Sequence, residues 1–292
     1  MVLPYFHAFT QGRPDFNLYE TDEDFVAGMN AIPLLLFRTH TTLLAAKLND
    51  SHEHFVLAGV EEECRQFLRE HVRHAALTAA IRQRRDGVSP AKYAGVKMSL
   101  LPITDPQSLR SRIAYVVKNA YDAGLPIAPW WDRWGCASAY FAGDMWKGVG
   151  CRIGDLGLVS ARRRLLHSQF DFPEDWRVDE QYRIHPVWYT DHLAVERLFG
   201  RPETLVRYLA SRSNAEEEEQ IRTASAMEKS VQEYRIMAAE LAREQLGTAD
   251  LRQLSPREVV MLSRHLLRRG ARYSQLQRIF GLSSDELRHL LR

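Results

Sequence analysis

The order of predicted strands and helices over residues 3–123 most constrains the fold of this chain. Segments between turn-forming residues have the composition of strands at 3–9, 42–48, 54–60 and 95–102. Apolar residues at helical spacing predict helices at 21–33, 61–84 and 105–123. The first six elements of this β-α-β-β-α-β-α order are those of a ferredoxin-like split βαβ, an antiparallel sheet with helices on one face. We therefore predict an α+β fold with an added seventh helix.

Local signals place the helix ends. Thr21 precedes three acidic residues and is a predicted N-cap, and Pro33 is expected to kink or end the helix that follows. The helix at 61–84 is expected to bury a stripe formed by Phe67, Val72, Leu77 and Ile81. These assignments give residues 1–143 a mixed fold with its own core.

The rest of the chain differs in composition. Residues 125–150 are rich in Trp, Gly and Pro and predict an ordered loop, since disordered linkers rarely carry four tryptophans. Residues 144–213 are predicted to be a mixed, mostly helical connecting region, and residues 214–292 an all-helical region.

The C-terminal region has the proportions of a helix-turn-helix. Ser255 and Glu258 predict a capping box, a helix to about Arg269 follows, and a second helix spans 274–280. A third helix is predicted at 284–291. Residues 255–292 contain eight Arg against three acidic residues, which favours duplex DNA binding through this last helix, with Arg278 and Arg288 as candidate contacts. The alternative is a small bundle that packs on the N-terminal domain.

Composition excludes several classes of protein. The net charge of +2 does not by itself predict nucleic-acid binding. Three isolated cysteines, at 64, 136 and 151, form no CxxC pair, which argues against a zinc ribbon or a disulfide framework and favours a reduced, intracellular chain. We see neither a secretory signal nor a membrane span, and we expect a cytoplasmic protein.

The segment His52-Glu53-His54 is the first candidate for chemistry. Side chains two residues apart in a strand point to the same face, so both imidazoles can reach one cation. The alternative is a pair of surface histidines in a polar turn. A zinc deaminase also carries H-x-E, but it requires a downstream P-C-x-x-C that this chain lacks.

Tyr115 and Asn119 form the second candidate. They lie four residues apart in a predicted helix and therefore share one face. The amide oxygen of Asn119 can be a third metal ligand, and a tyrosine phenolate beside a cation is a competent nucleophile. The alternative is a core tyrosine with an exposed asparagine.

Three segments together resemble one family. Residues 48–55 (LNDSHEHF) resemble the HUH segment of single-tyrosine transposases, in which two histidines flank a hydrophobic residue. Residues 113–125 (IAYVVKNAYDAGL) resemble the tyrosine helix of that family, and residues 134–141 (WGCASAYF) resemble the tail that follows it. The branch is that of the REP-associated tyrosine transposases, in particular longer members with an added helical region. The resemblance covers residues 10–141 well and the rest more loosely.

The resemblance implies an HUH endonuclease-like fold and a DNA transposase or single-strand endonuclease. Tyr115 would attack a phosphodiester of single-stranded DNA near a hairpin and form a 5′-phosphotyrosine, with Mg²⁺ or Mn²⁺ held by His52, His54 and Asn119. Such a protein would be associated with the nucleoid of a bacterial cytoplasm, and a homodimer is one of two arrangements in the family. Candidate DNA contacts are basic residues on two helices: Arg82, Arg84, Arg85, Arg110, Arg112 and Lys118.

Three positions depart from the family pattern. Glu53 stands where a hydrophobic residue is usual, Ala120 where Pro is usual, and Ser51 where Asn is usual. Because a buried ionised carboxylate is costly, we expect Glu53 at a strand end or beside a basic partner. We also expect Val at position 53 to preserve or raise activity and stability. These departures leave two alternatives open: a cleavage-dead protein that binds hairpin or repeat DNA, and a structural protein with a ferredoxin-like core.

Overall fold

The structure is a computed structural model of the whole chain. It describes residues 3–11, 17–85, 87, 96–122, 128–210, 231–269, 271, 273–282, 286 and 290. The side chains of residues 119–122 lie outside this description, although their backbone belongs to a helix.

A four-stranded antiparallel sheet forms the centre of the N-terminal domain. Its strands are β1 (Tyr5–Thr10), β2 (Thr42–Leu48), β3 (Glu53–Ala58) and β4 (Met98–Ile103), in the spatial order β2-β3-β1-β4. The two strands that come first and third in the sequence are therefore central. This arrangement confirms the predicted α+β class and antiparallel sheet, with strand limits within a few residues of those expected.

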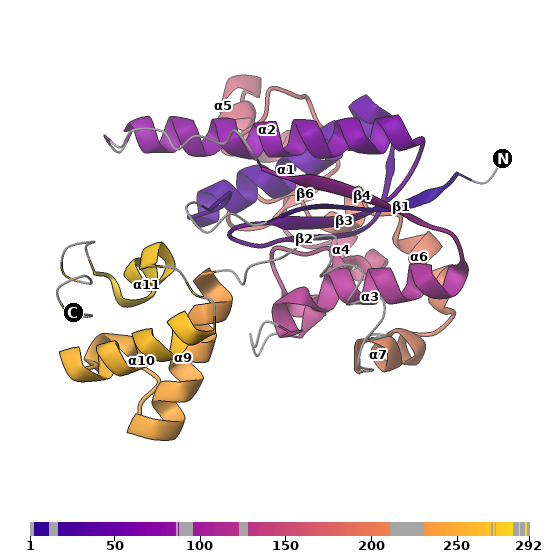
Figure 1. The fold of residues 1–292 in the computed structure, drawn as a ribbon. Coiled ribbons are helices and arrows are strands. Elements are labelled where there is room, and N and C mark those ends of the chain that lie inside the picture. The colour runs from indigo at the N-terminus through magenta and orange to yellow at the C-terminus, as the bar shows by residue number, and fades with distance from the viewer. Residues whose placement is uncertain are drawn as a thin grey trace.

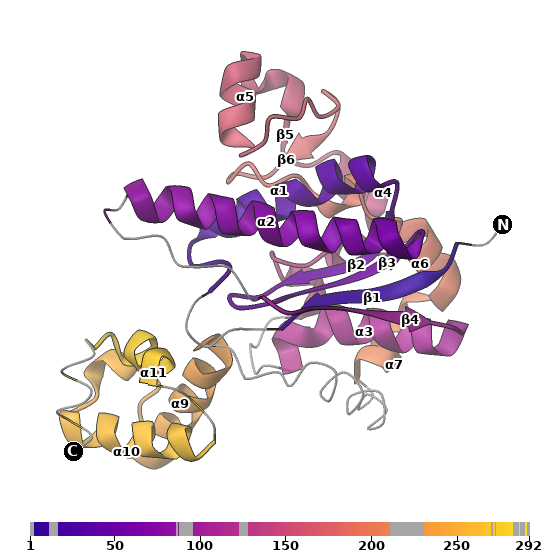
Figure 2. The same cartoon turned by 45° about the horizontal axis from the view of Figure 1, so that its top comes forward.

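Helices cover both faces of the sheet. α1 (Asp22–Thr39) and α2 (Glu61–Arg85) lie on one face, and α3 (Pro106–Asp122) lies on the other (Figures 1 and 2). Alternation along β3 divides its side chains between these layers: Phe55 packs on Phe67 of α2, whereas His54 packs on Tyr115 of α3. The single-face arrangement thus holds for α1 and α2, and the added helix closes the second face.

Helix α1 begins as predicted but ends later. The hydroxyl of Thr21 accepts a hydrogen bond from the backbone N–H of Asp24, and the carboxylate of Asp24 accepts one from Thr21. Pro33 was expected to kink or end the helix; it does not end it, because α1 continues to Thr39. The next turn buries Leu34, Leu35 and Leu36, and this burial offsets the hydrogen bond that proline cannot donate.

The buried stripe of α2 differs in part from the prediction. Phe67 and Val72 are buried as expected, but the side chains of Leu77 and Ile81 are 59% and 58% exposed. The second half of α2 instead buries the small side chains of Ala75 and Ala79. Small residues allow α2 to pack closely on α1, and this close approach directs the larger apolar residues outward.

Other segments cover the outer edge of β2. The backbone N–H of Leu48 donates to Trp134 (2.8 Å), that of Cys136 donates to Ala46 (3.2 Å), and that of Asp191 donates to Leu43 (2.8 Å). Unpaired strand edges invite pairing with another chain, and here loops saturate one of the two edges. The opposite edge of the sheet is β4.

Residues 129–210 form short elements that surround this edge. They are the single turns Pro129–Trp131, Ala137–Ala139, Ile153–Leu156 and Pro186–Trp188, the helices α4 (Gly143–Lys147), α5 (Val159–Leu165), α6 (His192–Phe199) and α7 (Pro202–Ala210), and the two-stranded sheet of β5 (Cys151–Arg152) and β6 (Arg177–Val178). Ile153, Phe172 and Ile184 form a small apolar cluster against Leu34 of α1. This cluster joins these elements to α1.

The C-terminal helices have an apolar cluster of their own. They are α9 (Val231–Leu246), α10 (Pro256–Arg268) and α11 (Tyr273–Phe280), with one turn at Leu251–Gln253 between the first two. The carboxylate of Glu258 accepts a hydrogen bond from the backbone N–H of Ser255, so the predicted capping box is present. The predicted helix at 284–291, including Arg288, lies almost entirely outside the described residues. The predicted domain limits stay predictions.

The length and hydropathy of each described helix determine whether it could span a membrane. Within the described ranges, none of the helices combines the length and the apolar character needed to cross a membrane.

Candidate functional site

The structure brings His52, His54 and Tyr115 together on the α3 face of the sheet. His54 is the second residue of β3, and its ring lies edge to face with the ring of Tyr115, with centroids 5.6 Å apart and planes at 88°. The ring of His52 lies 5.2 Å from that of His54, at 89°. His54 therefore faces the helix that carries the predicted nucleophile, and His52 lies beside His54.

Hydrogen bonds orient the ring of His52. Its Nε2 lies 3.1 Å from the amide nitrogen of Asn49, and its Nδ1 lies 3.1 Å from the hydroxyl of Ser51. Because an amide nitrogen can only donate, Nε2 of His52 holds a lone pair and Nδ1 carries the proton. This tautomer is the one that can bind a cation through Nε2, and a cation there would displace Asn49.

His54 contacts a third histidine that no motif had indicated. Nε2 of His7, on β1, lies 3.0 Å from Nδ1 of His54, and the two rings are stacked with centroids 5.2 Å apart. The ring of His7 also meets the edge of Tyr115, at 5.9 Å. We call His7, His52 and His54 the histidine cluster. All three side chains are buried.

Burial disfavours the protonated form of each histidine in the cluster. It lowers the pKa of His7 to about 3, with a smaller contribution from the positive charge of Arg112. It also lowers the pKa of His54 well below its usual value. Burial lowers the pKa of His52 as well, and the negative charges of Glu233 and Asp50 oppose this effect. Neutral imidazoles keep the lone pairs that metal coordination needs.

A buried ion pair borders the histidine cluster. Nζ of Lys47, on β2, lies 2.6 Å from a carboxylate oxygen of Asp132, and both side chains are almost fully buried. Lys47 is the cross-strand neighbour of His54, so it shares the α3 face, and its charge contributes to the lowered pKa of His52. Sequence reasoning missed this pair, because only the β2–β3 register and the loop that carries Asp132 bring it to the site.

Glu53 points to the opposite face of the sheet. It is the first residue of β3 and is fully buried against α1 and α2. One carboxylate oxygen accepts hydrogen bonds from the hydroxyl of Tyr19 (2.5 Å) and from Nδ1 of His71 (2.9 Å). The expectation of a strand end or a basic partner is confirmed on both counts, with histidine as the partner.

The predicted metal site is described only in part. The backbone of Asn119 lies one turn after Tyr115 in α3, but its side chain lies outside the described residues. Among the residues whose side chains are placed, no group of three or more His, Cys, Asp or Glu is arranged to hold a metal ion. The predicted ligand set has only two residues of these types. One atom suits a cation: Nε2 of His54 is buried and has no hydrogen-bond partner among the placed atoms.

The predicted basic contacts fall on two different faces. Arg82 binds Asp24 and Glu20 of the α1 region and Arg85 binds Glu23, so these cations on α2 stabilise the layer opposite Tyr115. Arg84 is exposed on the same helix. The remaining candidates lie on α3 with the nucleophile: Arg110 donates to the carbonyl of Leu198, and Arg112 and Lys118 are buried.

The tryptophans of the 129–134 loop divide into two groups. The side chains of Trp130 and Trp131 are 43% and 66% exposed and remain available for stacking on unpaired bases. Trp134 instead stacks on Phe25 of α1, with ring centroids 4.8 Å apart, and therefore fixes the loop to the domain.

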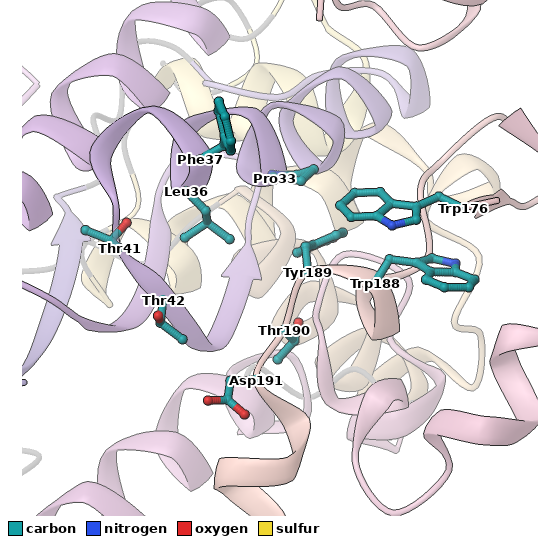
Figure 3. A pocket seen from close by; sticks show the side chains of 10 residues that line it. All are labelled: Pro33, Leu36, Phe37, Thr41, Thr42, Trp176, Trp188, Tyr189, Thr190 and Asp191. Carbon is teal, nitrogen blue, oxygen red and sulfur yellow. The ribbon is translucent and has the colours of Figure 1, made fainter. Parts of the chain in front are cut away.

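A separate pocket lies near the start of β2. It has a volume of about 400 Å³ and is bordered by Thr41 and Thr42, with Trp176, Trp188 and Tyr189 beside Pro33 of α1 (Figure 3). The histidine cluster lies at the other end of β2, where Lys47 pairs with His54. The pocket therefore does not belong to the candidate site.

The C-terminal helices contact the turn that carries His52. The backbone N–H of Gln232, at the start of α9, donates to the carboxylate of Asp50 (3.2 Å). Arg278 of α11 lies 3.6 Å from the carboxylate of Glu20, which also binds Arg82. The predicted DNA contact Arg278 thus also joins the C-terminal helices to the N-terminal domain.

Comparisons with known proteins give no match. No protein-family model, no curated protein and no solved structure matches this chain.

Proposed function

We propose that this protein cleaves and rejoins single-stranded DNA near hairpins, as an HUH-type single-tyrosine transposase does, with Tyr115 as its nucleophile. The observation that carries the proposal is the packing of the Tyr115 ring against His54, on the same face of the sheet as His52. A half-buried tyrosine whose ring lies against the imidazole of His54 fits a phenol that attacks near a bound cation.

The residues of the site suit a divalent cation such as Mg²⁺ or Mn²⁺. His54 offers a buried, unpartnered Nε2 within the described part of the chain, and the hydrogen bonds of His52 leave its Nε2 as an acceptor. Asn119, on α3, is the proposed third ligand. Stabilisation of charge on a phosphate oxygen is the chemistry that such a cation supplies.

The reaction that Tyr115 would perform is a transesterification. Its phenolic oxygen forms a bond to phosphorus while the bond from phosphorus to the 3′-oxygen of the preceding nucleotide breaks. The phenolic proton passes to solvent, and the departing 3′-oxygen takes up a proton. The products are a 5′-phosphotyrosine and a free 3′-hydroxyl, and attack by another 3′-hydroxyl reverses the step. Arg112 and Lys118, on the same helix, are the proposed phosphate contacts.

A second candidate function is binding of hairpin or repeat DNA without cleavage. One observation favours it: both ring nitrogens of His52 already have hydrogen-bond partners, Asn49 and Ser51. If a cation cannot displace Asn49, only one histidine remains as a ligand. Covalent capture of DNA distinguishes this function from the first.

A homodimer remains part of the proposal, and the sheet limits how it can form. A sheet that continues across two subunits needs an uncovered edge strand. Loop segments occupy the outer edge of β2, so the shared edge would be β4.

The direct test is capture of DNA by the full-length protein. Incubation with hairpin-flanked oligonucleotides and Mg²⁺ or Mn²⁺ should give a covalent adduct that survives a denaturing gel, and EDTA should prevent it. His52→Ala and His54→Ala should each lower adduct formation by more than about 10–100-fold, the range for groups that only support a metal ligand. His40→Asn, at the exposed C-cap of α1, is the control and should behave as wild type, because Asn accepts the left-handed backbone conformation there.

Three results would separate the alternatives. Adduct formation that persists in EDTA would exclude the metal role of the histidines. Hairpin binding with no adduct would favour the cleavage-dead function, and neither binding nor adduct would favour a structural protein.

Deletion of residues 214–292 should weaken binding to hairpin and duplex DNA while the N-terminal domain stays folded. The two parts have separate apolar clusters, and Arg252, Arg257 and Arg269 are exposed on the C-terminal helices. Removal of these cations should lower the slope of log affinity against log salt by about 1 for each phosphate group that is no longer neutralised. Gel shifts at two salt concentrations measure this, and equal slopes for both proteins would show that the C-terminal helices have a structural role only.

A further inference from the structure

His7 is the histidine of the cluster whose role the proposed function leaves open. It lies in the middle of β1, a central strand, and its side chain is fully buried. Its Nε2 lies 3.0 Å from Nδ1 of His54, and its ring also packs on Phe9 at 4.8 Å. Sequence motifs did not indicate it, because the pairing of β1 with β3 is what brings it to His54.

The hydrogen bond between Nε2 of His7 and Nδ1 of His54 contains one proton, and either ring can be its donor. A contact of 3.0 Å between two ring nitrogens is a hydrogen bond only if one nitrogen carries the proton and the other holds a lone pair, and each neutral ring has one of each. If His54 donates through Nδ1, its Nε2 holds the lone pair and can bind a cation. If His7 donates instead, Nε2 of His54 carries a proton and cannot bind one.

The ring that donates in this hydrogen bond determines the protonation of the other nitrogen of each ring. Nδ1 of His7 and Nε2 of His54 are both buried, and neither has a hydrogen-bond partner within the described structure. In either tautomeric state one of them carries a proton and the other a lone pair. A cation on Nε2 of His54 therefore fixes the proton of His7 on Nδ1.

We propose that His7 is the positioning residue for His54: its Nε2 accepts the Nδ1 proton of His54, holds that ring against Tyr115, and selects the tautomer that can bind a divalent cation. This inference rests on the proposed function. A metal-bound histidine usually donates its other N–H to a carboxylate, a carbonyl or water, and that bond fixes the ring and its tautomer. Here a neutral imidazole would serve as that acceptor.

The surroundings of His7 support a positioning role. Its ring touches the rings of both His54 and Tyr115, so it fills the space between β3 and α3. Nδ1 of His7 is buried and has no hydrogen-bond partner among the placed atoms, so a proton on this nitrogen leaves Nε2 free to accept. Neutral His7 is the form that can accept the proton of His54.

Variants of the full-length protein separate the hydrogen bond from the packing. His7→Leu removes the acceptor, His7→Gln keeps an acceptor near the position of Nε2, and Phe9→Leu disturbs the stacking of Phe9 on His54 without touching the bond. Titration with Mn²⁺, followed by electron paramagnetic resonance, measures metal affinity without DNA. We expect His7→Leu to weaken Mn²⁺ binding by about 10–100-fold, and the other two variants to stay within a few-fold of wild type.

The outcomes identify which idea fails. If His54→Ala abolishes Mn²⁺ binding but His7→Leu leaves it unchanged, the role of His7 is wrong and the metal site stands. If His54→Ala has no effect, the proposed metal site is wrong and the inference falls with it. Equal losses in His7→Leu and His7→Gln, with unchanged melting curves, would also overturn the role of the acceptor.

A measurement on the wild-type protein covers the case in which His7→Leu does not fold. Long-range proton–nitrogen correlation spectra assign the protonated nitrogen of each imidazole. With saturating Mg²⁺, both His7 and His54 should carry their proton on Nδ1. A spectrum that shows His54 protonated on Nε2 would contradict the proposal.

Discussion

Tyr115→Phe is expected to abolish the covalent protein–DNA adduct, a loss of about 10³-fold or more, because the change deletes the oxygen that attacks phosphorus. The ring of Tyr115 packs between His54 and His7, and phenylalanine keeps these contacts. Binding of hairpin DNA should therefore stay within a few-fold of wild type. Denaturing gels measure the adduct, and gel shifts on the same samples measure binding.

Tyr121→Phe provides the matched control, since Tyr121 is the next tyrosine of α3. It should leave the adduct unchanged. If the adduct survives Tyr115→Phe and disappears in Tyr121→Phe, Tyr121 is the nucleophile. The contact between Tyr115 and His54 would then have no role in catalysis. An adduct that survives both changes would exclude a tyrosine of α3 as the nucleophile.

The sequence predicted the sheet well because strand and helix periods differ clearly over residues 3–123. Its errors were local. Pro33 was expected to kink or end α1; it does not end it, because tertiary burial of the leucines after it outweighs the lost hydrogen bond. Leu77 and Ile81 fit a helical stripe by spacing alone, yet they face solvent, and the second half of α2 buries alanines instead. Periodicity reports the existence of a helix better than the face it buries.

The candidate site was predictable only where its residues are close in sequence. His52 and His54 share a face because strand side chains alternate, and Tyr115 comes from a helix whose motif resembles that of a family. His7 and Lys47 were missed because their neighbourhood depends on strand register: Lys47 is opposite His54, and His7 is near it from β1. Register is a property of the folded sheet, and no spacing within one segment encodes it.

Glu53 shows how the structure reverses an expectation drawn from resemblance. In the family that the sequence resembles, this position is hydrophobic. An isolated buried carboxylate is costly, so Val was expected to be tolerated here. Yet the Glu53 carboxylate is the common acceptor for Tyr19 and His71, and all three side chains are buried. Nε2 of His71 lies 3.0 Å from the carbonyl oxygen of Gly28, which accepts a hydrogen bond and so fixes the ring between two elements. Tyr19 and His71 therefore require a hydrogen-bond acceptor at position 53.

Glu53→Val is therefore expected to lower the free energy of unfolding by about 3–5 kcal/mol, the range for a buried pair that loses one partner. The change leaves the hydroxyl of Tyr19 and Nδ1 of His71 buried without their acceptor, and each unsatisfied group costs about 1–3 kcal/mol. Urea denaturation followed by circular dichroism measures the difference.

Glu53→Gln keeps an oxygen acceptor in the same volume and should cost less than Glu53→Val. Adding Tyr19→Phe to Glu53→Val removes one stranded donor, so the double variant should be less destabilised than the sum of the two single changes. Stability of Glu53→Val within about 0.5 kcal/mol of wild type, the scatter of changes at indifferent positions, would show that Tyr19 and His71 find other partners. In that case the carboxylate would not hold the start of β3 in place, and the orientation of His52 and His54 on the far face would rest on the backbone pairing of β3 with β1 and β2 alone.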